Sequence, residues 1–251
     1  MPTGAARRRF FYAHVQKAAG TELRERLKRN FEPQAMYPDP TDGDLFAVAP
    51  QMSATQLLAR WEVRKEEIEI VMGHFPVSTA ELLGPGFVTM TVLREPVERT
   101  LSQLRQYRKA SPALHGSELA AIYEDSPDYV FLRNHMVKMF SMTAAEVATA
   151  AREGKTPMVK YVQLDDSRLA SAKDRIASVD VFGLQDRFDQ FCGELESRFG
   201  WQLGTPLHAN RTEPADVPSE LRARIAADNA LDVEFYEHAR ELYERRSISG
   251  S

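Results

Sequence analysis

The sequence predicts an α/β fold in three layers, with a central parallel sheet flanked by helices. Short apolar segments typical of buried strands alternate along the chain with longer helical segments, an order that produces parallel sheets. Residues 87–93 are β-branched and almost continuously apolar, as a central parallel strand is. The 251 residues are enough for one large α/β core, and we expect a single domain over 1–251.

The first half of the chain is expected to supply three strands. In chain order, the expected elements are a strand over 10–15, a helix over 21–30, a long loop over 32–50, a helix over 53–66, a strand over 68–72 and a strand over 87–93. Ser53 is a suitable helix N-cap, and Gly73 ends the second strand. Pro96 indicates the start of the next helix, because its missing N–H costs nothing in a first turn.

The second half is expected to be mostly helical. Its expected elements are helices over 117–124, 128–140 and 143–153, a strand over 179–182, a helix over 186–199, a Pro-rich loop over 205–218 and a terminal helix over 219–245. Thr143 is a suitable N-cap, and Gly154 and Gly200 are typical helix stops. In such sheets, ligands bind beyond the carboxyl ends of the strands.

Composition limits the location of the protein. Cys192 is the one cysteine, so no intrachain disulfide can form and a reducing compartment is expected. No apolar run approaches the roughly 20 residues that span a bilayer. Arg7, Arg8 and Arg9 are not followed by the apolar stretch of a signal peptide. We therefore expect a cytoplasmic protein without membrane contact, and its oligomeric state is left open.

The charge distribution suggests a small anionic ligand. The net charge is −4, yet residues 1–30 carry a local +6 and residues 94–109 a local +3. Two basic segments on an acidic background favour a focused site for a small polyanion over a nucleic-acid surface. Charge alone favours the alternative that both segments are ordinary solvated helix faces.

A first motif follows the first expected strand, in residues 14–21 (H-V-Q-K-A-A-G-T). The small residues at 18–20 allow successive backbone amides to turn toward one point and form an anion nest. Thr21 opens a helix whose first amides favour a phosphate, and Lys17 adds a mobile positive charge. The Walker pattern G-x-x-x-x-G-K-[ST] is missing. A tight turn with an exposed lysine is an equally good interpretation of this segment alone.

A second motif follows the 87–93 strand, in residues 93–102 (L-R-E-P-V-E-R-T-L-S). Together, H-V-x-K-x-x-G-T and L-R-x-P-x-x-R-x-x-S resemble the membrane-type, or carbohydrate, sulfotransferase superfamily of heparan and chondroitin sulfotransferases, and this chain is similar to its soluble bacterial members. The resemblance implies a P-loop-like fold. It also implies transfer of a sulfuryl group from 3′-phosphoadenosine-5′-phosphosulfate (PAPS) to a hydroxyl acceptor, with 3′-phosphoadenosine-5′-phosphate (PAP) as the second product.

The resemblance also implies roles for individual residues. It implies that the first loop binds the 5′-phosphosulfate, through Lys17, Ala18, Ala19, Gly20 and Thr21. It also implies that Arg94 and Ser102 bind the 3′-phosphate. Arg99 matches a family arginine that either contacts phosphate or pairs with Glu95 or Glu98. The loop departs from the family at Gln16, Ala18 and Ala19, where Pro, Thr and Gly are commoner, and Ala19 restricts the backbone more than glycine does.

Sulfuryl transfer requires a base for the acceptor proton, and His74 is the favoured candidate. It follows the second expected strand, and imidazole titrates near neutral pH. The alternative is that His74 caps Gly73 or satisfies a loop carbonyl, and Glu81 is the reserve candidate for the base. Lys17 is expected to stabilise the leaving phosphate. The histidines form no H-E-x-x-H pair and there is no C-x-x-C, so we expect no metal requirement.

Two other functions are compatible with these motifs. One is a nucleotide-dependent, kinase-like phosphotransferase, which the missing Walker lysine disfavours. The other is a non-catalytic nucleotide-binding relative, which the Ala18-Ala19 pair would support. We expect a small-molecule or carbohydrate acceptor and no nucleic acid. The acceptor itself cannot be inferred, because the loops over 32–50 and 108–117 contain no recognisable motif.

Overall fold

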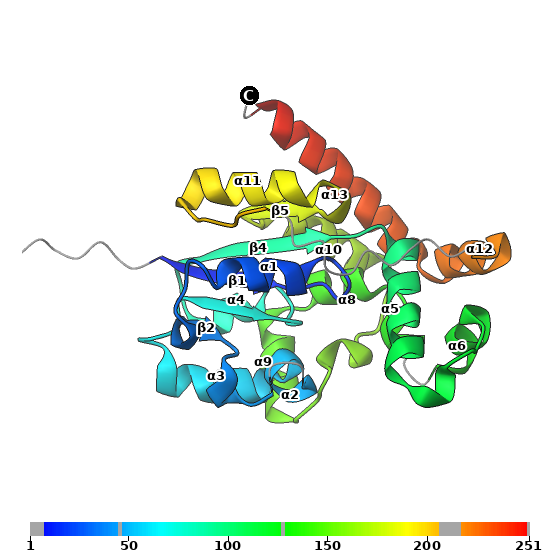
Figure 1. Cartoon of the computed structure of the whole chain (residues 1–251), viewed down its shortest axis with the longest axis horizontal. Helices are drawn as coiled ribbons and strands as arrows, with labels where there is room; N and C mark the ends of the chain where they lie inside the picture. The colour runs from blue at the N-terminus through cyan, green and yellow to red at the C-terminus, as the bar shows by residue number, and fades with distance from the viewer. Residues whose placement is uncertain (1–7, 45–46, 127–128, 206–216, 250–251) are drawn as a thin grey trace, which may run out of the picture.

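A computed structural model of the chain describes residues 8–44, 47–126, 129–205 and 217–249. Its centre is a five-stranded parallel sheet in the order β2-β3-β1-β4-β5, flanked by helices (Figure 1). The strands are β1 (Arg9–Ala13), β2 (Met36–Tyr37), β3 (Ile70–Gly73), β4 (Phe87–Leu93) and β5 (Val181–Leu184). The predicted three-layer α/β fold is therefore confirmed.

Helices connect the strands and cover both faces of the sheet. The α-helices are α1 (Gly20–Leu27), α2 (Val48–Met52), α3 (Ala54–Arg64), α4 (Thr79–Leu83), α5 (Pro96–Ala110), α6 (Leu119–Asp125), α7 (Tyr129–Leu132), α8 (His135–Ser141), α9 (Ala144–Arg152), α10 (Asp166–Ser178), α11 (Phe188–Phe199), α12 (Ser219–Asp228) and α13 (Ala230–Ser249). Short 3₁₀ turns are η1 (Pro33–Ala35), η2 (Pro40–Asp42), η3 (Pro112–Leu114), η4 (Met158–Tyr161) and η5 (Gln185–Arg187). None of these helices is long and apolar enough to cross a membrane.

The central strand β1 determines where a ligand can bind. Its residues Phe11 and Tyr12 are fully buried, and it pairs with β3 on one side and β4 on the other. From β1 the chain continues toward β2, whereas from β4 it continues toward β5 on the opposite side. The connections therefore diverge between β1 and β4, which is the position where open parallel sheets bind ligands.

Three sequence predictions about the elements need correction. Residues 32–50 are not all loop, because they contain the edge strand β2 and the start of α2. The single helix expected over 128–140 is divided into α7 and α8, and the terminal helix over 219–245 is divided into α12 and α13. The helix α10 lies in a region for which the sequence analysis predicted no element. Most of the loop expected over 205–218 falls outside the described residues.

The two helix breaks have one cause. Asn134 has a left-handed backbone (φ 48°), and its N–H donates to Asn229 Oδ1 at 2.8 Å. In return, Asn134 Oδ1 accepts from the Asp232 N–H at 3.0 Å. Asp232 is fully buried and accepts from the amides of Met136 (3.0 Å) and Val137 (2.8 Å), so it caps α8. Side chains at each break thus satisfy the backbone groups that the other break exposes.

A second hydrophobic core lies beneath α5. Val97, Leu101 and Leu104 of this helix pack with residues of α6, α7 and α12. At its outer end is an apolar pocket of about 330 Å³, lined by Tyr107, Ala110, Ser111, Leu114, Ser117, Ala121, Ile122, Asp125 and Ser126. This core fixes one face of α5, so the opposite side chains of the helix are held at the carboxyl edge of the sheet.

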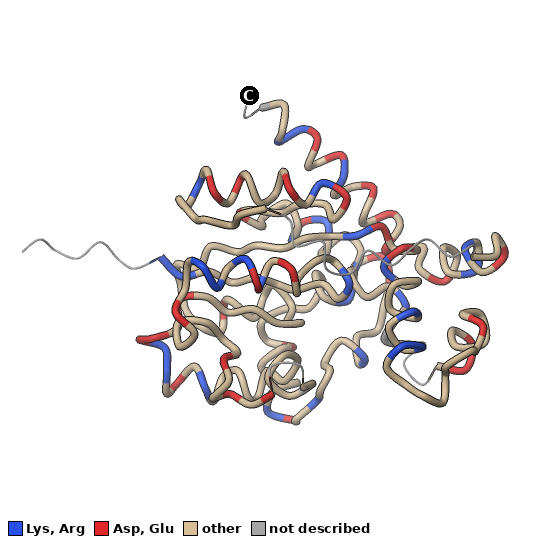
Figure 2. The backbone as a smooth tube through the Cα atoms, viewed as in Figure 1, with Lys and Arg blue, Asp and Glu red and all other residues tan. Residues whose placement is uncertain are grey.

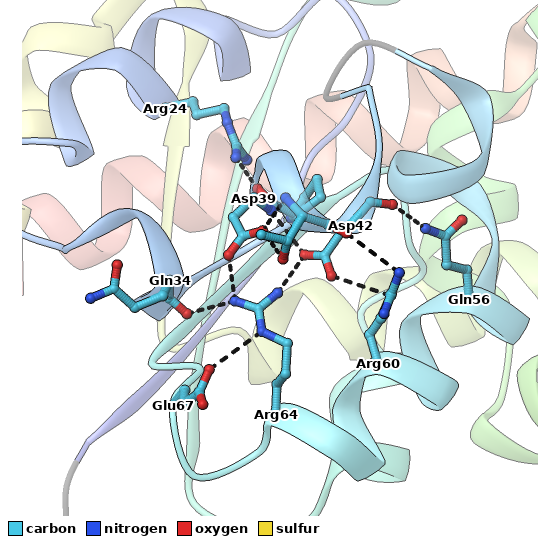
Figure 3. Close-up of polar contacts among 10 residues, drawn as sticks. Arg24, Gln34, Asp39, Asp42, Gln56, Arg60, Arg64 and Glu67 are labelled. Carbon is cyan, nitrogen blue, oxygen red and sulfur yellow. Dashed lines mark hydrogen bonds and ion pairs between the residues drawn. The ribbon is translucent and has the colours of Figure 1, made fainter.

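A buried ionic cluster holds the segment after β2 (Figure 3). Asp39 and Asp42 form a capping box around η2, and Arg64 of α3 reaches both carboxylates, at 2.6 and 2.7 Å. Arg24 of α1 donates to the Pro38 carbonyl next to this cluster. Burial opposes ionisation of Asp39, but hydrogen bonds from Thr41 and the charge of Arg64 lower its pKa. The cluster therefore fastens the 38–42 segment to α3, and Arg24 links the same segment to α1.

We predict that Arg64→Met lowers the free energy of unfolding by roughly 3 kcal/mol, because it leaves two buried carboxylates without their main partner. The matched control is Arg60→Met, one turn earlier on α3. Arg60 is 44% exposed and lies 3.5 Å from Asp42, so its loss should cost under about 1 kcal/mol. Urea unfolding of both variants measures the difference. Equal decreases in the free energy of unfolding for the two variants would show that Arg64 is not the main partner of the two carboxylates.

Candidate active site

The loop between β1 and α1 has an unusual backbone. Lys17 (φ 67°) and Ala19 (φ 62°) both adopt left-handed conformations, which glycine accepts more readily. The first backbone bond of the helix runs from Leu23 N–H to the Ala19 carbonyl at 3.0 Å. The amides from Gly20 to Glu22 precede that bond and have no intrahelical acceptor. The loop and helix start therefore have the arrangement of an anion nest.

Gly20 is required by the ring of His14. A Cβ atom on Gly20 would lie 2.0 Å from His14 Nε2, far inside van der Waals contact. The His14 ring also lies against His74, with ring centroids 4.3 Å apart. The glycine of the motif thus has a packing role in addition to its place at the helix start.

The second motif supplies Arg94 at the end of β4. Arg94 Nη1 donates to the Lys17 carbonyl at 3.0 Å, which joins the two motifs directly. Glu95 instead caps α5, accepting from Val97 N–H (3.0 Å) and Glu98 N–H (2.7 Å). Glu98 pairs with Arg222 of α12 at 2.6 Å. Among the residues that the structure describes, no carboxylate forms an ion pair with Arg94.

Lys17 lies beside α5, and Ser102 belongs to this helix. Lys17 Nζ donates to Gln106 Oε1, and burial together with the charge of Arg94 lowers the pKa of Lys17. Ser102 is half-buried, and within the described part of the chain its hydroxyl makes no hydrogen bond. The sequence analysis missed Gln106. No local motif marks it, because its position depends on how α5 passes the loop.

Arg99 is a structural residue. Its side chain is fully buried and its Nη2 donates to the Leu132 carbonyl of α7 at 2.7 Å. The sequence analysis allowed either a phosphate contact or pairing with Glu95 or Glu98. The structure shows neither carboxylate as its partner, and Arg99 instead joins α5 to α7.

His74 is held by one ring nitrogen. Its Nδ1 lies 2.7 Å from the His14 carbonyl oxygen. A carbonyl only accepts, so Nδ1 carries the proton and Nε2 keeps its lone pair. Burial lowers the pKa of His74 to about 4, and the charge of Lys17 adds to this effect against the opposing hydrogen bond. His74 is therefore neutral near pH 7, with Nε2 able to accept a proton.

Glu81, the reserve base, lies elsewhere. On α4 it forms an ion pair with Arg175 of α10 at 2.5 Å and is half-exposed. In the described ranges, no group of three or more His, Cys, Asp or Glu side chains could hold a metal ion.

The left-handed backbone at Ala19 gives a stability prediction. A residue with a Cβ atom destabilises the folded state by roughly 1–2 kcal/mol in this conformation. Glycine removes this strain, but its greater freedom in the unfolded chain offsets part of the gain. Ala19→Gly should therefore raise the free energy of unfolding by up to about 1 kcal/mol in thermal or urea unfolding. The neighbouring Ala18 is fully buried without a positive φ, so Ala18→Gly should lower it by about 1 kcal/mol. An equal decrease in the free energy of unfolding for both variants would contradict the left-handed backbone at Ala19.

Comparison with known proteins adds a distant relative. No model of a protein family matches the chain. It is 24% identical over 192 residues to galactose-3-O-sulfotransferase 3 of Bos taurus, a match that covers 72% of this chain and 44% of that protein. The chain thus spans less than half the length of this relative. The match supports a distant relationship between this chain and the sulfotransferases.

Proposed function

We propose that the chain is a PAPS-dependent sulfotransferase, with one sulfotransferase domain over 1–251. It transfers a sulfuryl group to a hydroxyl of a carbohydrate or small metabolite. The observation that carries this proposal is the bond from Arg94 to the Lys17 carbonyl at 3.0 Å. This bond joins the loop after β1 to the end of β4 where the strand connections diverge, and the distant relative is a sulfotransferase named for galactose.

The two segments suit the two ends of PAPS. The small-residue loop and the amides that start α1 would receive the 5′-phosphosulfate, with the exposed Thr21 hydroxyl as a further donor. Arg94 and Ser102 would receive the 3′-phosphate, since a guanidinium can engage two phosphate oxygens at once. The hydroxyl of Ser102 has no competing protein acceptor among the described residues.

The remaining side chains suit in-line sulfuryl transfer. The acceptor oxygen attacks sulfur while the bond from sulfur to the bridging phosphate oxygen breaks, and that oxygen keeps the electron pair. His74 Nε2 takes the acceptor proton, because its Nδ1 proton is held by the His14 carbonyl. Lys17 exchanges its contact with Gln106 for the bridging oxygen and stabilises the charge that develops there.

Ligand preference and turnover test the proposal together. PAP should raise the melting temperature more than ATP with magnesium does, because only PAP has the 3′-phosphate. Radiolabelled PAPS should then transfer label to members of a saccharide and small-hydroxyl library. Stabilisation by ATP with magnesium alone would indicate a phosphotransferase. Binding of PAP without transfer to any acceptor would indicate a non-catalytic relative.

The role of His74 gives a kinetic prediction. His74→Ala should lower kcat by roughly 10²–10⁴-fold with PAP affinity unchanged. His74→Asn can still donate to the His14 carbonyl but cannot act as base, so it should lose as much activity; rescue by asparagine would make His74 structural. Since the pKa of His74 is about 4, the wild-type kcat should stay flat as pH falls to about 5 and decline below that. A protonation limb near pH 6.5 would contradict this assignment.

A further inference from the structure

Arg94 in the second motif and Arg105 just after it form no ion pair with any carboxylate of the described residues. Arg105 lies on α5 three residues after Ser102, and its positive charge disfavours ionisation of Arg94. Burial is the largest cause of the lowered pKa of Arg94, Glu98 opposes it, and Arg105 adds to it. The Nε atoms of both guanidinium groups are buried and have no hydrogen-bond partner among the described residues. Two partly desolvated like charges therefore lie near enough to interact.

The nearby carboxylates are already engaged. Glu95 caps α5 and Glu98 pairs with Arg222. Asp232 caps α8 and its charge acts on the buried Arg99. In the described ranges, Arg105 itself makes no hydrogen bond or ion pair. Burial without a partner is costly for a charged group, so this arrangement suits a site whose anion arrives with the ligand.

The helix directs Arg105 toward Ser102. Residues three apart share one face of a helix, and long side chains on helices lean toward its amino end. The Arg105 guanidinium is therefore carried back toward Ser102 and the strand end that bears Arg94. Figure 2 shows that basic residues continue along α5 beyond this point, where Arg108 and Lys109 occupy the last turn.

We propose that Arg105 is the second arginine of the 3′-phosphate site, so that Arg94, Ser102 and Arg105 together hold that group. This inference rests on the proposed function. A phosphate dianion offers three oxygens, and two guanidinium groups with a hydroxyl can satisfy them while the dianion neutralises both positive charges. One arginine alone would leave part of that charge unpaired.

Isothermal titration tests the inference with two nucleotides. PAP has the 3′-phosphate and adenosine 5′-phosphosulfate lacks it. Arg105→Met keeps the side-chain stem and should weaken PAP binding about 10- to 100-fold, while the affinity for adenosine 5′-phosphosulfate changes less than twofold. Arg94→Ala should weaken the binding of both nucleotides, and that of PAP more, because Arg94 also holds the Lys17 carbonyl. The matched control is Arg108→Met, on the next turn of α5, which should change neither affinity by more than twofold.

The melting temperature of the ligand-free protein separates a binding role of Arg105 from a structural one. A purely structural role predicts that the loss of Arg105 lowers this temperature. Because Arg105→Met removes a repulsion from Arg94, its melting temperature should equal or exceed that of the wild type. A melting temperature several degrees lower, together with parallel losses for both nucleotides, would make Arg105 structural and overturn the inference.

Two further outcomes would also overturn the inference. If wild type and Arg105→Met bind PAP equally and turn over PAPS, only the role of Arg105 fails; a raised KM for the acceptor would then place an acceptor anion there. If the folded wild type does not bind PAP, the proposed function fails with it.

Discussion

The hydrogen bond from Arg94 to the Lys17 carbonyl is the interaction on which the arrangement of the site depends. It crosses from the end of β4 to the loop after β1, where the strand connections diverge. Lys17, whose carbonyl accepts this bond, has a left-handed backbone. A local conformation in one motif is thereby tied to the side chain of the other, and the second core beneath α5 holds that helix alongside.

The electrostatics of the site follow from an excess of positive charge. Lys17, Arg94 and Arg105 cluster at the carboxyl edge of the sheet, while the carboxylates of the second motif are used for capping and for a surface ion pair. Such a site favours an anionic ligand and keeps a neighbouring imidazole neutral. The low pKa of His74 and the lowered pKa values of the cations therefore have a common origin in burial with like charges.

Local signals predicted much of the fold. The β-branched run and Pro96 give the bounds of β4 and the start of α5 without error, because they act within a few residues. The breaks at Asn134 and Asn229 were missed because they depend on each other across roughly a hundred residues of sequence. The two-residue strand β2 is too short for a periodic pattern and exists through its pairing with β3.

The motifs marked the loops that meet, but side-chain partners such as Gln106 depend on the path of α5, which sequence does not reveal. The contact between His14 and Gly20 also limits how the site can change. One imidazole fills the space above the glycine, and its own carbonyl holds the ring of His74. The loop after β1 and the ring of His74 are thus mechanically linked. A side chain at residue 20 would displace the His14 ring, and the backbone that carries this ring also holds His74, so residues 14 and 20 can only be changed as a pair.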